Sequence, residues 1–296
     1  MLLAKGNDTG ETAVSLAKRY HYRAVVRLVE QTAFCPPTPM NNRTRLCPNV
    51  VLVVALLLCI CTGRASSALE NSFSHLWGGY STSLHLRSQE QRHNSSTAAR
   101  DLDGTIIPPG GMFSFNQLVG ARDTGKGYQA APMITASGRM LDTPGGGICQ
   151  LASTIYNAGL LAGMQVVERH PHSRAVGHIP PGRDATISSW RKDLKLKNPH
   201  QQPLQLRMSV DQNRITTSFY ATREKPFSTE IRVSRTRLLP DTVLLGKGAG
   251  TAEQPGGSGF ATETVRITTR NGTSRTELIS RDTYPPPSRI ISTEAP

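Results

Sequence analysis

The sequence predicts an α+β fold in which one buried helix packs on short antiparallel strands, followed by a small all-β domain. Residues 149–164 carry apolar side chains at helical spacing and form the one clear helix expected between residues 99 and 226. Short apolar segments bounded by Gly, Pro and Asn lie on both sides of this helix and continue to the C-terminus. That pattern is typical of strands joined by turns.

The composition limits the class of protein. A chain of 296 residues with 37% hydrophobic and 5% aromatic residues suits one or two domains with an aliphatic core. The 26 glycines and 20 prolines are an ordinary share, which excludes a collagen or a wholly disordered chain. The 34 basic residues outnumber the 21 acidic ones and give a net charge of +13.

The N-terminal part resembles an export signal. Residues 50–61 form an uninterrupted apolar run, with Arg43 and Arg45 before it and small residues after it. This arrangement predicts a signal peptide over residues 40–68. The run is shorter than the roughly 20 residues that a spanning helix needs, but an uncleaved membrane anchor is the alternative. Residues 1–39 are expected to be an N-terminal extension, to which no pattern assigns a structure.

The cysteines are concentrated in this leader. Their positions are Cys35, Cys47, Cys59, Cys61 and Cys149. Loss of the leader would leave Cys149 alone and lower the net charge to about +8. An exported chain with one thiol has no disulfide within itself, so Cys149 is a candidate reactive group.

Three segments follow the leader. Residues 69–98 are rich in Ser, His, Asn and Gln and predict a linker, residues 99–226 a first domain, and residues 228–292 a separate β module. In the β module, an Asn271-Gly272 pair between two alternating segments predicts a hairpin. The strands expected in the first domain are 128–134, 165–168, 184–190, 194–197, 204–210 and 215–220.

The residues around Cys149 suggest nucleophilic chemistry. Three glycines precede Cys149 and place it in the first helical turn, where the helix dipole and free N–H groups favour a thiolate. About 20 residues later, His170 and His172 flank a proline, and either could accept the proton of the thiol. Asp184 opens a later strand and could orient the imidazole.

Other interpretations use the same residues. Cys149 could be a small buried residue, and His170 and His172 could be structural. Alternatively, these three side chains could bind zinc, with Asp184 or water as the fourth ligand. No other cofactor is expected.

Several motifs stand in order along the first domain. They are Pro109–Asn116, Gly127–Pro132, Gly145–Gln150, Glu168–Ser173, Pro181–Ala185 and Asp193–Asn198. Together they resemble the VanW-like family, of the vancomycin-resistance accessory type, over residues 99–222. Residues 228–292 resemble the small β module called G-five. The family positions that carry over are Gly146, Gly147, Cys149, Gln150, Glu168, Arg169, His170, His172, Arg183 and Asp184.

The resemblance implies an exported cell-envelope protein, membrane-anchored or secreted, that binds or acts on peptidoglycan or its peptide stems. The chemistry expected at Cys149 is acyl transfer, as in a peptidase or transpeptidase, with Gln150 or nearby backbone N–H groups holding the oxyanion. The residues expected to contact substrate are Gly146, Gly147, Gln150, Glu168, Arg169 and Arg183. The alternative is a non-catalytic peptidoglycan-binding module with a structural or zinc-binding Cys/His cluster.

The charge points to wall polymers as partners. A basic surplus attracts anionic polymers over long range. No basic helix and no aromatic–basic platform is present, so no nucleic-acid partner is expected. A membrane contact is expected only through an uncleaved N-terminal segment.

Overall fold

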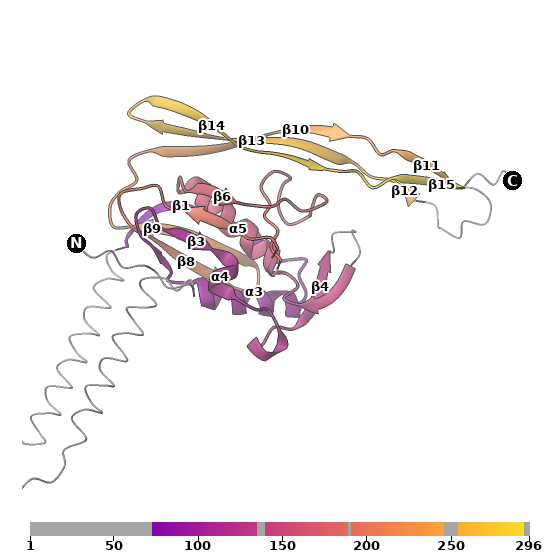
Figure 1. Ribbon diagram of the computed structural model, residues 1–296, viewed down its shortest axis with the longest axis horizontal. Coiled ribbons are helices and arrows are strands. Elements are labelled where there is room, and N and C mark those ends of the chain that lie inside the picture. The colour runs from indigo at the N-terminus through magenta and orange to yellow at the C-terminus, as the bar shows by residue number, and fades with distance from the viewer. Residues whose placement is uncertain (1–72, 135–139, 189–190, 246–253, 293–296) are drawn as a thin grey trace, which may run out of the picture. The chain divides into compact units, whose positions relative to one another are not determined.

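The computed structural model describes residues 73–134, 140–188, 191–245 and 254–292. These residues belong to one compact unit and form a strand-rich mixture of helices and strands (Figure 1), which confirms the predicted α+β class. The predicted extension and signal segment, with their four cysteines, lie outside the described residues. Within the described ranges, no helix is long and apolar enough to cross a membrane.

A four-stranded antiparallel sheet forms the base of the first domain. Its order is β1 (His75–Ser83), β9 (Arg214–Ala221), β8 (Leu204–Val210) and β2 (Ile106–Ile107). Neighbouring strands pair antiparallel throughout. The predicted strands over 204–210 and 215–220 are therefore confirmed.

Helix α5 (Ile148–Leu161) lies against β1 and β9 of this sheet. Twelve of its fourteen residues are buried, including polar ones such as Ser153 and Asn157. The sequence predicted an apolar stripe, but the helix is enclosed on nearly every side, as expected of a central helix. Its polar side chains are consequently satisfied by hydrogen bonds within the domain: Asn157 Nδ2, for example, donates to the carbonyl of Arg183 at 2.6 Å.

The linker predicted over residues 69–98 is not what the described part of that segment forms. Strand β1 pairs with β9, and helix α3 (Gln89–Leu102) packs on β8 and α5. The face that α3 buries is largely polar, so its sequence lacks the apolar periodicity that marks most helices. Its buried residues are Gln91, Asn94, Ser95, Thr97, Ala98, Ala99 and Leu102.

Smaller elements complete the first domain. They are β3 (Met112–Ser114), α4 (Phe115–Val119), the 3₁₀ turn η1 (Thr124–Lys126), β4 (Ala130–Ile134), β5 (Met140–Pro144), β6 (Gln165–Glu168) and β7 (Lys195–Lys197). Strands β3, β7 and β6 form one sheet, and β4 pairs with β5. The strand predicted over 184–190 is wrong for its described part, because this segment makes only the isolated bridges His170–Thr186 and Ser188–Lys192.

The C-terminal module consists of strands. The long strands β10 (Ser228–Leu238), β13 (Gly259–Arg270) and β14 (Thr273–Tyr284) form one sheet, and β11 (Thr242–Leu245), β15 (Arg289–Ser292) and β12 (Gln254–Pro255) form another (Figure 1). Asn271 and Gly272 join β13 to β14 with φ angles of 50° and 77°. Positive φ at both positions is what a type I′ turn requires, so the predicted hairpin is confirmed.

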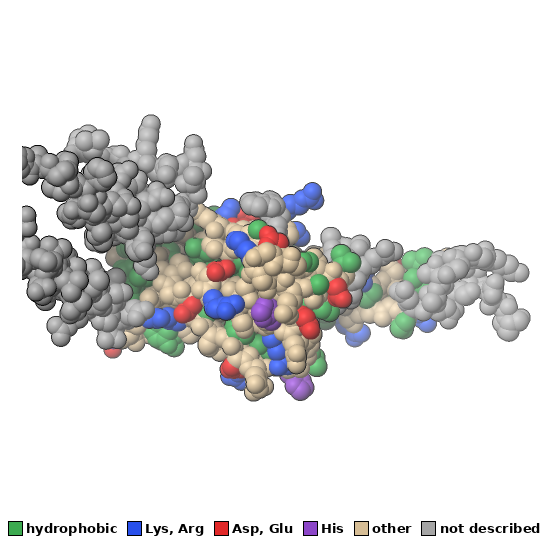
Figure 2. Space-filling model, turned by 90° about the horizontal axis from the view of Figure 1, so that it is seen from below, with side chains coloured by type: hydrophobic (Ala, Val, Ile, Leu, Met, Phe, Trp, Pro, Cys, Tyr) green, Lys and Arg blue, Asp and Glu red, His purple; other side chains and the backbone are tan. Residues whose placement is uncertain are grey.

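One face of the molecule is seen in Figure 2. Basic and acidic side chains are interspersed on it among polar and hydrophobic ones. The basic side chains on this face are scattered and form no continuous basic patch there.

We predict that Gly78→Ala destabilises the first domain. A Cβ at Gly78 would lie 2.4 Å from the backbone N of Ala162 and 2.5 Å from the carbonyl O of Ala158, so β1 and the end of α5 would have to move apart. Overpacking of this kind costs about 1–3 kcal/mol or more. Chemical denaturation measures the loss. Gly177→Ala is the matched control, because nothing lies within 4 Å of its Cβ position, and an equal loss there would contradict the explanation.

Candidate functional site

Cys149 is the second residue of α5 and is half-buried. The glycines before it allow close packing. A Cβ on Gly146 would lie 2.2 Å from the carbonyl O of Ala131, and one on Gly147 would lie 3.0 Å from the carbonyl O of Gln91. Gly147 also has a φ of 101°, which favours glycine. Packing of β4 and α3 against the helix start thus accounts for both glycines without a ligand.

The surroundings of the thiol favour its ionised form. The Sγ atom lies 3.6 Å from Thr186 Oγ1 and 3.6 Å from the carbonyl O of Ile187. Burial raises the pKa of Cys149, but the interaction with the His172 imidazole more than offsets it and brings the pKa to about 7. A large share of the thiol is therefore a thiolate, the nucleophilic form, at neutral pH.

His172 connects the thiol to a buried carboxylate. Its Nδ1 lies 2.6 Å from Oδ2 of Asp184, which leaves Nε2 as the nitrogen that can serve Cys149. Burial lowers the pKa of His172, but Asp184 and Cys149 together raise it to about 9. Thiolate and imidazolium can therefore coexist between about pH 7 and pH 9.

Asp184 is fully buried and accepts hydrogen bonds on both oxygens. Its Oδ2 also accepts from the backbone N–H of His172 at 2.7 Å, and its Oδ1 accepts from Arg169 Nη2 at 2.9 Å and from the hydroxyl of Tyr284. Burial raises the pKa of Asp184, but His172 and Arg169 lower it to about 2. The carboxylate thus stays charged and fixes the orientation of the imidazole.

Two of these contacts come from the C-terminal module. The hydroxyl of Tyr284, at the end of β14, accepts from the backbone N–H of Gly182 at 2.8 Å while it donates to Asp184. Asp282 accepts from Arg169 Nη1 at 2.6 Å. Strand β14 therefore contributes to the group of residues that holds Asp184 in place.

His170 lies in a different cluster. Its Nε2 is 3.0 Å from Oε1 of Glu168, whose Oε2 is 2.8 Å from Lys195 Nζ. The hydrogen bonds from Lys195 lower the pKa of Glu168 to about 2. The structure thus brings Cys149 together with His172 and Asp184, and it places His170 and Glu168 in a partly exposed ion-pair cluster.

Gln150 and Arg183 have structural partners. The Nε2 of Gln150 donates to Thr82 Oγ1 at 3.0 Å and to the carbonyl O of Ser83 at 2.7 Å, so the amide is fully used. The guanidinium of Arg183 donates to Asn157 Oδ1 and lies over the ring of Tyr80, 5.4 Å from its centroid. These two side chains hold α5 to its neighbours.

Sequence reasoning missed several neighbours of the thiol. Arg87 donates from Nη2 to Nδ1 of His178 at 2.8 Å, and the His178 ring packs edge-on against His172 with centroids 5.8 Å apart. Thr186 contacts the thiol itself. The one sequence signal nearby is Ser88, directly after Arg87, with Gln91 three residues later; the two form a capping box at the start of α3.

The zinc alternative requires Cys149, His170 and His172 to converge, with Asp184 or water as the fourth ligand. His170 faces Glu168 instead. Across the described ranges, no group of three or more His, Cys, Asp or Glu residues is arranged to hold a metal ion.

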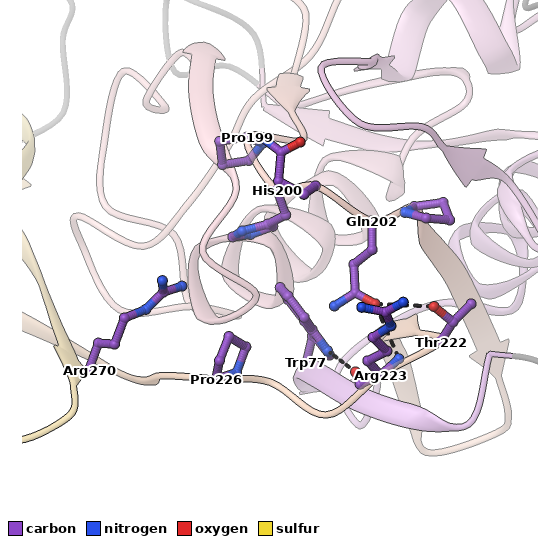
Figure 3. Close-up of a pocket in the computed structure, with 10 residues that line it drawn as sticks. Trp77, Pro199, His200, Gln202, Thr222, Arg223, Pro226 and Arg270 are labelled. Carbon is purple, nitrogen blue, oxygen red and sulfur yellow. Dashed lines mark hydrogen bonds between the residues drawn. The ribbon is translucent and has the colours of Figure 1, made fainter.

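A cavity of about 560 Å³ lies away from the thiol (Figure 3). Trp77 in its wall donates from Nε1 to the carbonyl O of Arg223 at 2.8 Å, and Oε1 of Gln202 accepts from the backbone N–H of Arg223 at 3.1 Å. Arg270 of the C-terminal module also lines this cavity. Trp77 and Gln202 thus hold Arg223, which belongs to the segment between β9 and β10.

Two known proteins are similar in sequence to this chain. The chain is 37% identical over 175 residues to YoaR of Bacillus subtilis, described as an uncharacterized protein, covering 59% of this chain and 55% of YoaR. It is 29% identical over 153 residues to the vancomycin B-type resistance protein VanW of Enterococcus faecalis, covering 49% and 54%. The chain therefore spans about half the length of these two relatives.

Two solved structures also match. One is the G5 domain of HP0197, with a TM-score of 0.17 and 17% identity, covering 24% of this chain and 100% of that structure. The other is the G5 domain of an IgA1 protease, with a TM-score of 0.19 and 19% identity, covering 22% and 86%. Residues 90–220, the part of the chain that holds Cys149, His172 and Asp184, match the family model described as VanW like protein.

Proposed function

We propose that this chain is an exported cell-envelope protein that cleaves or transfers acyl groups of peptidoglycan stem peptides through Cys149. The observation that carries the proposal is the row of contacts from Cys149 through His172 to Asp184. Nucleophilic cysteine enzymes use a thiol, a histidine and an orienting group in this order. The cell-envelope assignment draws on the similarity to a vancomycin resistance protein and on the predicted signal segment.

The reaction follows from the charge states. The thiolate of Cys149 attacks a peptide carbonyl carbon and forms a C–S bond. The imidazolium of His172 then donates its Nε2 proton to the leaving amine as the C–N bond breaks. Water or an acceptor amine attacks the thioester, His172 takes its proton, and the C–S bond breaks to restore the thiolate. Asp184 keeps His172 oriented in both halves.

The oxyanion needs a donor other than the side chain of Gln150. That amide donates to Thr82 and Ser83, so it is not free to face a substrate. The N–H groups of the first helical turn have no partner earlier in a helix. We assign the backbone N–H of Cys149 to the oxyanion, because it lies in that turn beside the nucleophile.

The C-terminal module has two roles in this proposal. Its resemblance to G-five modules supports binding of wall polymers, to which the basic surplus would add a long-range attraction. Its Tyr284 and Asp282 also position Asp184 and Arg169. Binding of wall polymers and acyl transfer at Cys149 would then both depend on the packing of the C-terminal module against the first domain.

We predict that the thiol of Cys149 titrates near pH 7. Iodoacetamide alkylation rates measured across pH report the thiolate fraction. In His172→Ala the pKa should rise to about 8.5 or above, because burial is then opposed only by the weaker interactions with Thr186 and Ile187, and the rate at pH 7 should fall about tenfold.

His170→Ala is the matched control for this titration. It removes an imidazole two residues away that pairs with Glu168, so the thiol should still titrate near pH 7. A thiol that titrates at 8.5 or above in the wild-type protein, with no effect of His172→Ala, would contradict the nucleophile.

Tyr284→Phe should weaken the site without removing it. Asp184 and Gly182 each lose a hydrogen bond, which costs about 1–3 kcal/mol of stability, and His172 is held less firmly. The thiol pKa should rise, but by less than in His172→Ala. Tyr128→Phe is the control, since the buried hydroxyl of Tyr128 has no hydrogen-bond partner within the described ranges. Equal effects in the two variants would argue against a positioning role for Tyr284.

Incubation of the protein with purified sacculi tests the reaction itself. Mass spectrometry should detect released or newly cross-linked stem peptides with the wild type and at least about a hundredfold less with Cys149→Ala. Binding to sacculi without any product, in wild type and variant alike, would instead favour a non-catalytic binding module.

A further inference from the structure

Two arginines, Arg87 and Arg122, flank the start of α5 and take no part in the contacts between Cys149, His172 and Asp184. Arg87 follows β1 and directly precedes the N-cap of α3. Arg122 follows α4. Both are partly buried, and both interact through their charge with the thiolate of Cys149.

Arg87 is held in place by neutral groups. Its Nε donates to Oε1 of Gln150 at 2.6 Å, and Nη2 donates to Nδ1 of His178 at 2.8 Å. Burial, with the charge of Arg87 close by, lowers the pKa of His178 to about 3, so this imidazole is neutral. Within the described ranges, no carboxylate makes an ion pair with Arg87.

Arg122 packs against the Gly-rich turn before the helix. A Cβ built on Gly145 would lie 3.2 Å from the Cβ of Arg122, so the Arg122 side chain is in close contact with this turn. Its Nη1 donates to Oδ1 of Asn116 at 2.8 Å. Two guanidinium groups from separate parts of the chain are thus fixed beside the same helical turn.

Among the cations near the thiol, Arg87 is the one for which the described ranges hold no carboxylate in an ion pair. Arg122 interacts through its charge with both Cys149 and Asp193, Arg169 pairs with Asp184 and Asp282, and His172 pairs with Asp184. Burying a guanidinium without a carboxylate partner is costly, and burial does lower the pKa of Arg87. A ligand with a negative charge would offset this cost.

We propose that Arg87, with Arg122 beside it, binds a free carboxylate of the substrate next to the bond that Cys149 attacks. The proposal rests on the function proposed above and narrows its substrates to peptides with a free carboxylate within about one residue of the scissile bond, such as a C-terminal residue. A planar guanidinium binds a carboxylate through paired, charge-assisted hydrogen bonds. Gln150 and His178 orient Arg87 by accepting one N–H each from Nε and Nη2, which leaves the two N–H groups of Nη1 and the second N–H of Nη2 for this contact.

The experiment compares two reagents for the same thiol. Iodoacetate carries a carboxylate and iodoacetamide does not, so the ratio of their alkylation rates, divided by the same ratio for glutathione, reports attraction of a carboxylate to Cys149. We expect a ratio about tenfold above glutathione in the wild type. It should fall roughly three- to tenfold in Arg87→Gln and in Arg122→Gln, while Arg87→Lys should retain most of it.

Arg235→Gln is the matched control. It makes the same change of charge on the exposed edge of strand β10, so the ratio should not change. An alanine tripeptide should also protect Cys149 from iodoacetamide better as the free acid than as the C-terminal amide, and Arg87→Gln should remove this difference.

The outcomes separate this proposal from the one it rests on. A wild-type ratio equal to that of glutathione, or a ratio unchanged in both arginine variants, would overturn the carboxylate site even if the thiol titrates near pH 7. A thiol that reacts with iodoacetamide only above about pH 8.5 would instead overturn the nucleophile. If Arg87→Gln fails to fold, the other two variants still decide the question. A lower alkylation-rate ratio in Arg122→Gln, together with a largely retained ratio in Arg87→Lys, would support the carboxylate site.

Discussion

The buried carboxylate of Asp184 is the interaction on which the rest of the site depends. A buried charge is tolerated only when it is paired and hydrogen-bonded, and Asp184 meets both conditions through His172, Arg169 and Tyr284. Arg169 and His172 lie three residues apart in one segment, whereas Tyr284 lies 100 residues beyond Asp184 in the sequence. The position of His172, and with it the ionisation of Cys149, follows from how this one carboxylate is satisfied.

The charges of the site are balanced in two layers. Asp184 and Asp282 together balance the charges of Arg169 and His172 in the interior, where water screens them little. Nearer the thiol, Arg87 has only neutral partners and the thiolate. The inner layer therefore supports the orientation of His172, whereas the outer layer retains positive charge that an incoming anion can use. Removal of Asp184 or one of its partners should therefore disturb the orientation of His172, whereas removal of Arg87 should weaken the binding of an anion.

The sequence predicted the parts of this molecule whose signals are local. The Asn271-Gly272 hairpin and the alternating strands 204–210 and 215–220 follow from neighbouring residues, and the structure has them. Helix α3 was missed because its buried face is polar, although the capping box at Ser88 was a usable signal. Cys149 and His172 could be proposed from their spacing, but Arg87 could not. Arg87 comes close to the thiol because β1, the strand before it, packs against α5 in the folded chain.

The contact between Tyr284 and Asp184 joins residues that are 100 positions apart in the sequence. Closing so long a loop costs entropy, which the packing of strand β14 must offset. The hydroxyl of Tyr284 can reach Asp184 only when β14 is docked on the first domain. A polymer that binds the C-terminal module and favours its docked position would thereby favour the ordered carboxylate as well. The docked position of β14 and the ordered carboxylate are in this sense thermodynamically linked, because whatever stabilises one of them stabilises the other.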